Sequence, residues 1–354
     1  MNRNIYKARL KAVRAGIAGA GADCLISTKP ANVTYLTGFT GEDSWAIVLP
    51  QAVVLVTDSR YTEQAAGECR FCRIIERAGK MVSAAAEEIR RWRKIKTSAV
   101  EKTISLAEFV SLRKELSCRV KGAEGIVESV RRIKDRAEAD GIRAATKVAA
   151  GVFRRILRQV KPGLTENVLA GMVDFEIRKA GCTNSFETIA AFGANASRPH
   201  HKPTSRKLKK NDTVLIDFGV RLNGYCCDIT RCFSVGTPMK LYGRAYAAVE
   251  EAQMAAIKTL KAGVEISRVD AAARDIIRKS GLPVYGHGTG HGLGLEVHEL
   301  PMVSGRTKGK LQAGDVITIE PGVYIPGRLG IRIEDDCLVT EDGCVILTDI
   351  CPKA

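Results

Sequence analysis

The stretch Thr213-Val-Leu-Ile-Asp-Phe-Gly219 is an apolar strand with an aspartate inside it and a glycine at its end. The stretch Val316-Ile-Thr-Ile-Glu-Pro-Gly322 repeats this arrangement with a glutamate. A turn or loop and a second strand follow each stretch, and a further acid belongs to each second arm, Asp228 in one case and Glu334 in the other. The sequence therefore predicts two hairpin-like units, related as a degenerate internal repeat, that face each other across one site.

The two predicted hairpins bring four carboxylates together: Asp217, Asp228, Glu320 and Glu334. A carboxylate within an apolar strand is costly to bury unless a positive charge pairs with it. Arg231 and Arg332 are the only bases in the hairpin arms close to these acids. Because two arginines are few for four buried acids, we expect metal ions to supply the missing positive charge.

All five histidines of the chain fall in the same part as the four acids: His200, His201, His287, His291 and His298. Three of them lie within Gly286-His-Gly-Thr-Gly-His-Gly-Leu-Gly-Leu-Glu-Val-His298. Carboxylates combined with imidazole form a ligand set for a pair of first-row divalent ions. We expect manganese, with cobalt, zinc or iron as the alternatives.

The glycines of this histidine-rich stretch allow a second interpretation, a phosphate-binding loop. A dinucleotide fingerprint needs a strand, then G-x-G-x-x-G, then a helix. Here the spacing is G-x-G-x-G, a predicted helix comes before it, and a strand-like segment follows. We therefore expect the glycines to let the backbone pass close to the metals instead.

The length of 354 residues suits two domains. Residues 1–124 predict an α/β domain, residues 125–354 an α+β domain, and residues 121–125 a linker. We expect helices over residues 6–21, 82–91, 127–160, 165–181, 245–260 and 267–281, and strands over residues 46–49 and 53–56. Thr165 is the expected N-cap of its helix, and Asp270 stands at the capping-box position of the last helix.

The net charge of +16 raises the possibility of a nucleic-acid partner. The charge is, however, divided evenly between residues 1–125 and 126–354, and neither end has a basic tail. The densest basic cluster, Arg90-Arg-Trp-Arg-Lys94, contains one aromatic residue and is typical of a solvated helix face. We therefore do not expect a nucleic-acid partner.

The eleven cysteines are an odd number and are scattered along the chain, which does not indicate a disulfide framework. Cys69 and Cys72 form a lone C-x-x-C motif without a second pair at zinc-finger spacing. No run of 18 apolar residues predicts a membrane span, and the N-terminus does not resemble a signal peptide. These features predict free thiols in a cytoplasmic protein without a membrane partner.

The order of these motifs resembles the pita-bread metallopeptidases, and within them the Xaa-Pro branch of aminopeptidase P and prolidase. The matching stretches are Asp217-Phe-Gly219, Asp228-Ile-Thr-Arg231, Gly290-His-Gly-Leu-Gly-Leu-Glu-Val-His-Glu299, Ile319-Glu-Pro-Gly322 and Ile331-Arg-Ile-Glu-Asp335. Asn32-Val-Thr-Tyr-Leu-Thr-Gly-Phe39 and Asp58-Ser-Arg-Tyr61 resemble the creatinase-type N-terminal module. The resemblance covers nearly the whole chain and implies an α/β N-terminal domain followed by an α+β pita-bread catalytic domain.

The resemblance implies a role for each matching residue. Asp217 would bind one metal ion, His291 and Glu320 the other, and Asp228 and Glu334 would bridge both. His200 would steady the tetrahedral intermediate and His298 would contact the scissile region. His287 would line the proline pocket, and Arg332 would lie beside the bridging glutamate; His201 matches no role and is expected to be structural.

The implied reaction is hydrolysis of the bond between an N-terminal residue and a following proline, with Glu320 as the proton shuttle. That bond is a tertiary amide without an N–H group, so a pocket shaped for the proline ring is needed. Strict dipeptidases of the family often carry a proline and then an arginine shortly after the Glu299 position, whereas this chain has Pro301-Met302 there. This departure favours aminopeptidase activity on longer peptides, although Arg306 or another base could substitute.

Two other readings of the sequence stay open. The chain could be a related pita-bread hydrolase for a small guanidino compound or for a different N-terminal residue. It could also be a non-catalytic binding protein of this fold, which the positive charge would suit. The resemblance further implies a homodimer.

Overall fold

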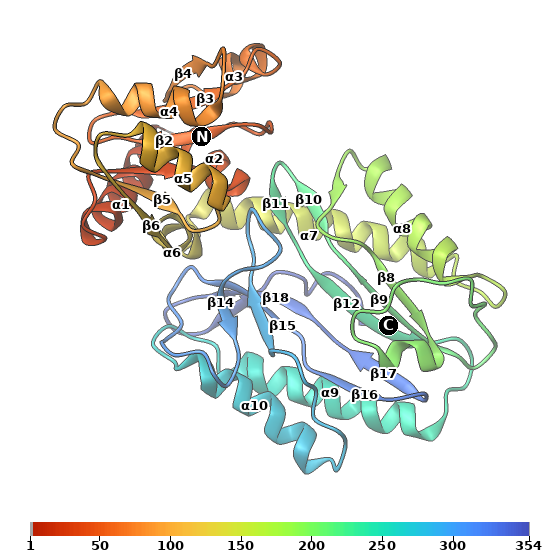
Figure 1. Ribbon diagram of the computed structural model, residues 1–354. Helices are drawn as coiled ribbons and strands as arrows, with labels where there is room; N and C mark the ends of the chain where they lie inside the picture. The colour runs from red at the N-terminus through yellow and green to blue at the C-terminus, as the bar shows by residue number, and fades with distance from the viewer. Residues whose placement is uncertain (1–2, 354) are drawn as a thin grey trace. The chain divides into compact units, whose positions relative to one another are not determined.

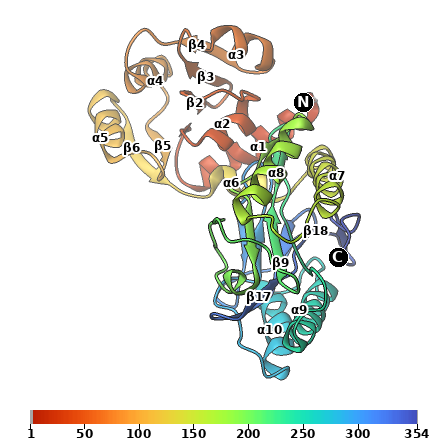
Figure 2. The same ribbon diagram turned by 90° about the vertical axis from the view of Figure 1, so that its right-hand side faces the viewer.

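The computed structural model describes residues 3–353, and the chain forms two compact units, residues 1–131 and 132–354. Figures 1 and 2 show the helices and strands of each unit from two sides. Because each unit has its own sheets and its own hydrophobic core, we describe them separately.

The first unit is built on a six-stranded mixed sheet with the order β4-β3-β2-β1-β5-β6. Its strands are β1 (Cys24–Ser27), β2 (Trp45–Val48), β3 (Val53–Thr57), β4 (Arg73–Glu76), β5 (Thr97–Glu101) and β6 (Arg119–Ala123). Its helices are α1 (Arg3–Gly19), α2 (Pro30–Thr37), α3 (Thr62–Glu68), α4 (Met81–Arg90) and α5 (Leu106–Glu115), and α6 (Ile126–Arg132) ends it. Every residue of β1, β2 and β3 is buried, as expected of strands covered on both faces.

Four small sheets are present in the described part of the second unit, residues 132–353. One three-stranded sheet has the order β12-β9-β8 and consists of β12 (Ile229–Ser234), β9 (Thr213–Phe218) and β8 (Ile189–Phe192). A second three-stranded sheet has the order β11-β10-β7 and consists of β11 (Tyr225–Cys226), β10 (Val220–Leu222) and β7 (Thr183–Asn184). The five-stranded sheet has the order β14-β13-β15-β18-β19, from β14 (Glu299–Val303), β13 (Gly290–Gly292), β15 (Val316–Ile319), β18 (Asp335–Val339) and β19 (Cys344–Ile346). β16 (Gly322–Ile325) and β17 (Leu329–Arg332) form a separate hairpin.

Two pairs of helices pack on the strands of the second unit (Figure 1). α7 (Arg136–Leu157) and α8 (Glu166–Lys179) share one hydrophobic cluster with β8, β9 and β12. α9 (Lys240–Lys258) and α10 (Ile266–Lys279) share another with β15, β17 and β18. Each half of the unit therefore combines a helix pair with the strands that carry two of the four acids.

The predicted helix over residues 127–160 is wrong near its start, because residues 133–135 separate two helices, α6 and α7. Ile133 forms a β-bridge with Asp315, and the backbone N–H of Lys134 donates to the carbonyl of Gly314. Asp135 then caps α7 in a capping box with Glu138. The predicted linker also differs, because its first three residues belong to β6.

The predicted capping role of Asp270 is wrong as well. The residue before α10 is Glu265, whose side chain makes no capping hydrogen bond, whereas Asp270 lies buried within the helix. Its carboxylate accepts hydrogen bonds from Arg274 Nε at 2.7 Å and from Thr289 Oγ1 at 2.7 Å. The helix thereby uses this aspartate to hold the segment that leads to His291. The N-cap role of Thr165 is confirmed by its bond from the Val168 N–H.

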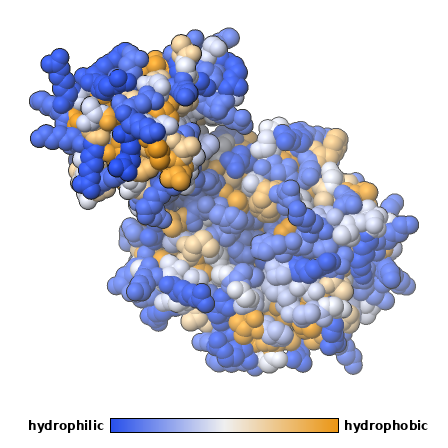
Figure 3. Space-filling model, in the orientation of Figure 1, coloured by the Kyte–Doolittle hydropathy of each residue, from blue (hydrophilic) through white to orange (hydrophobic). Residues whose placement is uncertain are grey.

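Hydrophilic residues cover most of the face drawn in Figure 3, and hydrophobic residues form separate patches on it. Among residues 3–353, no helix has the length and apolar character needed to cross a lipid bilayer. All eleven cysteines fall in this described part of the chain, and each is a free thiol.

Candidate metal centre

The predicted acids lie where strands end or begin. Asp217 is the fifth residue of β9, and Asp228 directly precedes β12. Glu320 directly follows β15, and Glu334 directly precedes β18. His291 is the central residue of β13, which pairs with β15. Each proposed ligand therefore belongs to a paired strand or directly adjoins one, so the sheets hold its backbone in place without a metal ion.

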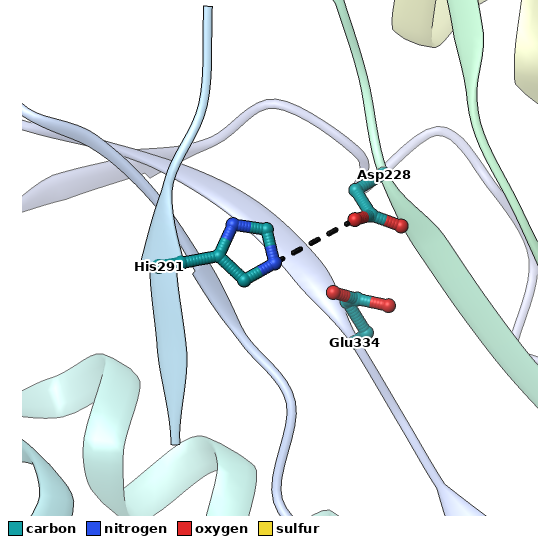
Figure 4. Close-up of side chains that lie close together, drawn as sticks. All are labelled: Asp228, His291 and Glu334. Carbon is teal, nitrogen blue, oxygen red and sulfur yellow. Dashed lines mark ion pairs between the residues drawn. The ribbon is translucent and has the colours of Figure 1, made fainter. Parts of the chain in front are cut away.

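Three of these side chains point toward one another, as Figure 4 shows. One ligand atom from each of Asp228, His291 and Glu334 lies within 4.8 Å of the others. His291 Nε2 lies 3.7 Å from Asp228 and 3.5 Å from Glu320. The other ring nitrogen, Nδ1, lies 3.0 Å from the carbonyl of Gly292 and can only donate to it. This contact leaves Nε2 as a lone-pair donor directed at the acids, the arrangement seen in metal-binding histidines.

Few protein cations reach the four acids. Arg332 pairs with Asp217, whereas the buried Arg231 pairs with Asp335 at 2.7 Å and so serves an acid outside the set. The Oδ1 atoms of Asp217 and Asp228 are buried and have no hydrogen-bond partner among residues 3–353. Unpaired buried carboxylate oxygens are rare because they are costly, so a positive ion fits this position.

The pKa values of the acids show the same deficit of positive charge. Burial raises the pKa of Asp228 and of Glu334 well above the ordinary range, and the neighbouring carboxylates raise both further. Burial also raises the pKa of Glu320 to about 7, although Arg332 opposes the shift. The pKa of His291 is lowered to about 4, mainly by burial, so its imidazole is neutral and able to bind a metal.

A cavity of about 530 Å³ opens onto these groups. All nine predicted site residues line it: His200, Asp217, Asp228, His287, His291, His298, Glu320, Arg332 and Glu334. The size falls within the range of small-molecule and peptide sites. The structure thus brings all the predicted site residues to one cavity, whose lining also includes apolar side chains such as Ile189 and Val297.

The histidines of the cavity differ in their surroundings. His298 stacks edge-on against His291 with ring centroids 4.4 Å apart, and burial lowers its pKa. His287 is held by Tyr324, whose hydroxyl lies 3.0 Å from its Nε2, and burial lowers its pKa to about 4. His200 is exposed on the cavity wall. His287 is therefore neutral and held in place by Tyr324, and His200 and His298 also line the cavity.

His201 lies outside the ligand cluster and is bound to Glu166, a residue that the sequence did not single out. The fully buried carboxylate of Glu166 accepts hydrogen bonds from Phe192 N at 2.8 Å and Asn195 Nδ2 at 2.8 Å. Its other oxygen lies 2.8 Å from His201 Nε2, 3.0 Å from Thr204 N and 2.6 Å from Thr204 Oγ1. Glu166 thus holds both flanks of the loop that carries His200.

Two further contacts were missed. Tyr324 accepts a hydrogen bond from Arg332 Nη1 at 2.8 Å and so joins that arginine to His287. Glu299, the residue after His298, forms an ion pair with Lys134 at 2.9 Å, and both side chains are almost fully buried. Glu299 belongs to the motif Gly290–Glu299, but nothing in the local sequence indicates that its partner is Lys134.

The glycines beside His291 meet neighbouring strands. A Cβ on Gly290 would lie 1.8 Å from the carbonyl oxygen of Thr318 in β15. A Cβ on Gly292 would lie 2.1 Å from the carbonyl oxygen of Leu300 in β14. These two glycines therefore allow close approach to the two flanking strands of the sheet. The expected passage of the backbone close to metal ions stays a prediction.

Comparison with known proteins agrees with this geometry. Residues 140–341 match metallopeptidase family M24, and residues 9–133 match the creatinase/prolidase N-terminal domain. An uncharacterized peptidase of Bacillus subtilis is 36% identical over 95% of this chain and 96% of its own length.

Solved structures show the same fold. The structure of a Xaa-Pro dipeptidase from Bacillus anthracis is 32% identical, covers 99% of both chains and gives a TM-score of 0.95. That of an X-Pro aminopeptidase from Thermotoga maritima is 34% identical, covers 96% of this chain and 99% of its own, and gives a TM-score of 0.89. The expected two-domain fold is therefore confirmed, and the chain belongs to metallopeptidase family M24, with a creatinase/prolidase N-terminal domain before the catalytic domain.

Proposed function

We propose that this chain is a Xaa-Pro peptidase that hydrolyses the bond between an N-terminal residue and a following proline. The observation that carries the proposal is the convergence of four carboxylates, three of them buried, and of His291 on one cavity of about 530 Å³. Few protein cations pair with these acids. The names of the Bacillus anthracis and Thermotoga maritima proteins, a dipeptidase and an aminopeptidase for such bonds, support the substrate class.

Membership of a metallopeptidase family implies divalent metal ions. We propose two, with manganese as the native metal and cobalt, zinc or iron as alternatives. Asp217 would hold one ion, His291 and Glu320 the other, and Asp228 and Glu334 both. When bound, such ions supply Lewis acidity and make water nucleophilic near neutral pH.

The side chains of this chain would perform the remaining steps. Glu320, whose pKa lies near 7, would take a proton from the attacking water at its carboxylate and pass it to the leaving proline nitrogen. His200 and His298 would donate hydrogen bonds to the oxygen on which negative charge develops. His287, held in place by the Tyr324 hydroxyl, would line the pocket for the proline ring.

Three finer assignments complete the proposal. A homodimer is proposed from the resemblance to this family, and size-exclusion chromatography with light scattering would test it. A cytoplasmic location is supported by the eleven free thiols, which would oxidise in a secretory compartment. Nucleic acid is not proposed as a partner, because the positive charge is divided evenly between residues 1–125 and 126–354.

The experiment strips the purified protein of metal and assays it with added manganese or cobalt against a Xaa-Pro dipeptide and a Xaa-Pro-Xaa tripeptide. Metal-dependent cleavage that is lost in Asp228→Ala and retained in Asp342→Ala, an exposed acid in the turn before β19, would support the proposal. Metal binding without cleavage of either peptide would favour a related hydrolase with another substrate. Failure to bind metal would favour a non-catalytic binding protein.

A further inference from the structure

Two charged side chains line the accessible part of the cavity without an ion-pair partner among residues 3–353, Lys202 and Glu187. The cavity lining contains one other lysine or arginine, Arg332, and its guanidinium is buried and occupied by Asp217, Tyr324 and Thr230. Lys202 is therefore the basic side chain that a substrate entering the cavity meets with its charge unused.

The backbone on both sides of Lys202 is fixed. The preceding residue, His201, and Thr204 two positions later both bind the buried carboxylate of Glu166. Pro203 restricts the chain between them. The lysine ammonium is thus free to move at the end of its side chain, but its Cα is held beside His200 and the reaction centre.

Lys202 is close in the chain to His200, the histidine proposed to stabilise the oxyanion of the scissile carbonyl. Lys202 lies two positions from His200, so their Cα atoms are separated by at most about 7 Å. In a Xaa-Pro dipeptide the free carboxylate lies about one residue, roughly 3.5 Å, beyond the scissile bond. A lysine side chain is long enough to span this separation, and Ile189 and Val297, which also line the cavity, are apolar.

We propose that Lys202 binds the free α-carboxylate of the substrate, so that the enzyme prefers Xaa-Pro dipeptides to longer Xaa-Pro peptides. This inference rests on the proposed peptidase function and names its substrate class. In a longer peptide a neutral amide replaces the carboxylate, and the lysine then has no anionic partner. Lys202 would therefore supply the carboxylate contact that Met302 cannot make.

The test compares two substrates with the same scissile bond, Ala-Pro as the free acid and as its C-terminal amide. For the metal-loaded wild-type protein we expect a higher kcat/KM on the acid. For Lys202→Met we expect about a tenfold loss on the acid, mostly in KM, because one charge-assisted contact is removed, and no change on the amide. Lys202→Arg should retain the preference.

Two control variants separate a contact from a general charge effect. Lys210→Met removes the same charge from an exposed position outside the cavity lining and should leave both substrates unaffected. Glu187→Gln should leave the preference for the acid in place. Equal losses on acid and amide in Lys202→Met, or no loss on either, would overturn the role of Lys202 while the peptidase function stands. Failure of the wild-type protein to cleave either compound would overturn the peptidase function and this inference with it.

Discussion

Asp228→Asn should stabilise the metal-free protein and destabilise the metal-loaded protein. The Asp228 carboxylate is buried, its Oδ1 atom has no hydrogen-bond partner in the described chain, and burial together with Glu334 and Asp217 raises its pKa. Asparagine has nearly the same shape and no charge. The substitution therefore removes the desolvation and repulsion of one carboxylate while the packing stays the same.

The size of the stability gain follows from the difference between the pKa of Asp228 in the folded protein and its ordinary value, because the folded protein must keep this carboxyl protonated. Each pH unit by which the folded pKa exceeds the ordinary value costs about 1.4 kcal/mol, and at pH 7 the ceiling for an aspartate is about 4 kcal/mol. We expect a gain of about 2 kcal/mol, which raises the melting temperature by roughly 4–8 °C in a domain of this size. With metal, an ion at a thousand times its Kd stabilises by about 4 kcal/mol, and Asp228→Asn should lose most of that contribution.

Asp335→Asn is the matched control, because neutralising this buried aspartate should destabilise the metal-free protein, whereas neutralising Asp228 should stabilise it. Asp335 is equally buried, but it accepts bonds from Arg231 at 2.7 Å, Thr348 at 2.7 Å and Gln253 at 3.0 Å. Its neutralisation leaves a buried arginine without its counter-ion and should cost about 3–5 kcal/mol with or without metal. Differential scanning calorimetry of both variants, in chelator and in excess manganese, measures these shifts. An Asp228→Asn protein that melts below the wild type in chelator would refute the reasoning.

Two more predictions concern glutamates of the second unit. Glu166→Ala should cost about 3–5 kcal/mol in stability, because five hydrogen bonds that hold the His200 loop are lost. At a temperature where the variant is folded, its kcat should be at least tenfold lower than that of the wild type. The control Glu176→Ala, on the same helix, loses an ion pair with Arg155 and should leave kcat unchanged. The stability of the metal-free protein should fall as pH rises from about 4.5 to about 7, because folded Glu320, with a pKa of about 7, keeps a proton that the unfolded chain releases. Urea unfolding in chelator measures this slope, which Glu320→Gln should flatten; a stability that rises over this interval would contradict the assignment.

The position of the candidate site could be predicted because its signals are local. Each acid stands at the end or start of an apolar strand, so Asp217 and Glu320 are recognisable from a few neighbouring residues. Glu166 could not be found in this way, since its partners lie 26 to 38 residues further along the chain. Its place directly after the N-cap Thr165 indicates only a helix start.

The errors in the helices have the same origin. The break at residues 133–135 depends on Gly314 and Asp315, about 180 residues away, although the capping box at Asp135 was a local sign of it. At Asp270 a local capping pattern was present, but a buried contact with Thr289 determined its role instead. Local patterns therefore identified which residues carry the chemistry, whereas the supports of those residues depend on the completed fold.

The repeated design explains how four acids stay together without enough cations. Each half of the second unit runs as strand, acid, short hairpin, acid and strand, with β10 and β11 inserted in one half and β16 and β17 in the other. The two halves are joined at the acids themselves, because Thr230 Oγ1 donates to Glu334 at 2.6 Å and the backbone N–H of Asp228 donates to Asp336 at 3.1 Å.

These links fix the separation of the carboxylates through the backbone of the sheets. The acids therefore cannot relax apart when no ion is bound, and their mutual repulsion persists in the folded metal-free protein. A site of this kind is organised before the cation arrives, so binding does not have to include the ordering of its ligands. The cost appears in the stability of the metal-free fold, which is why neutralising Asp228 should strengthen that fold while weakening the site.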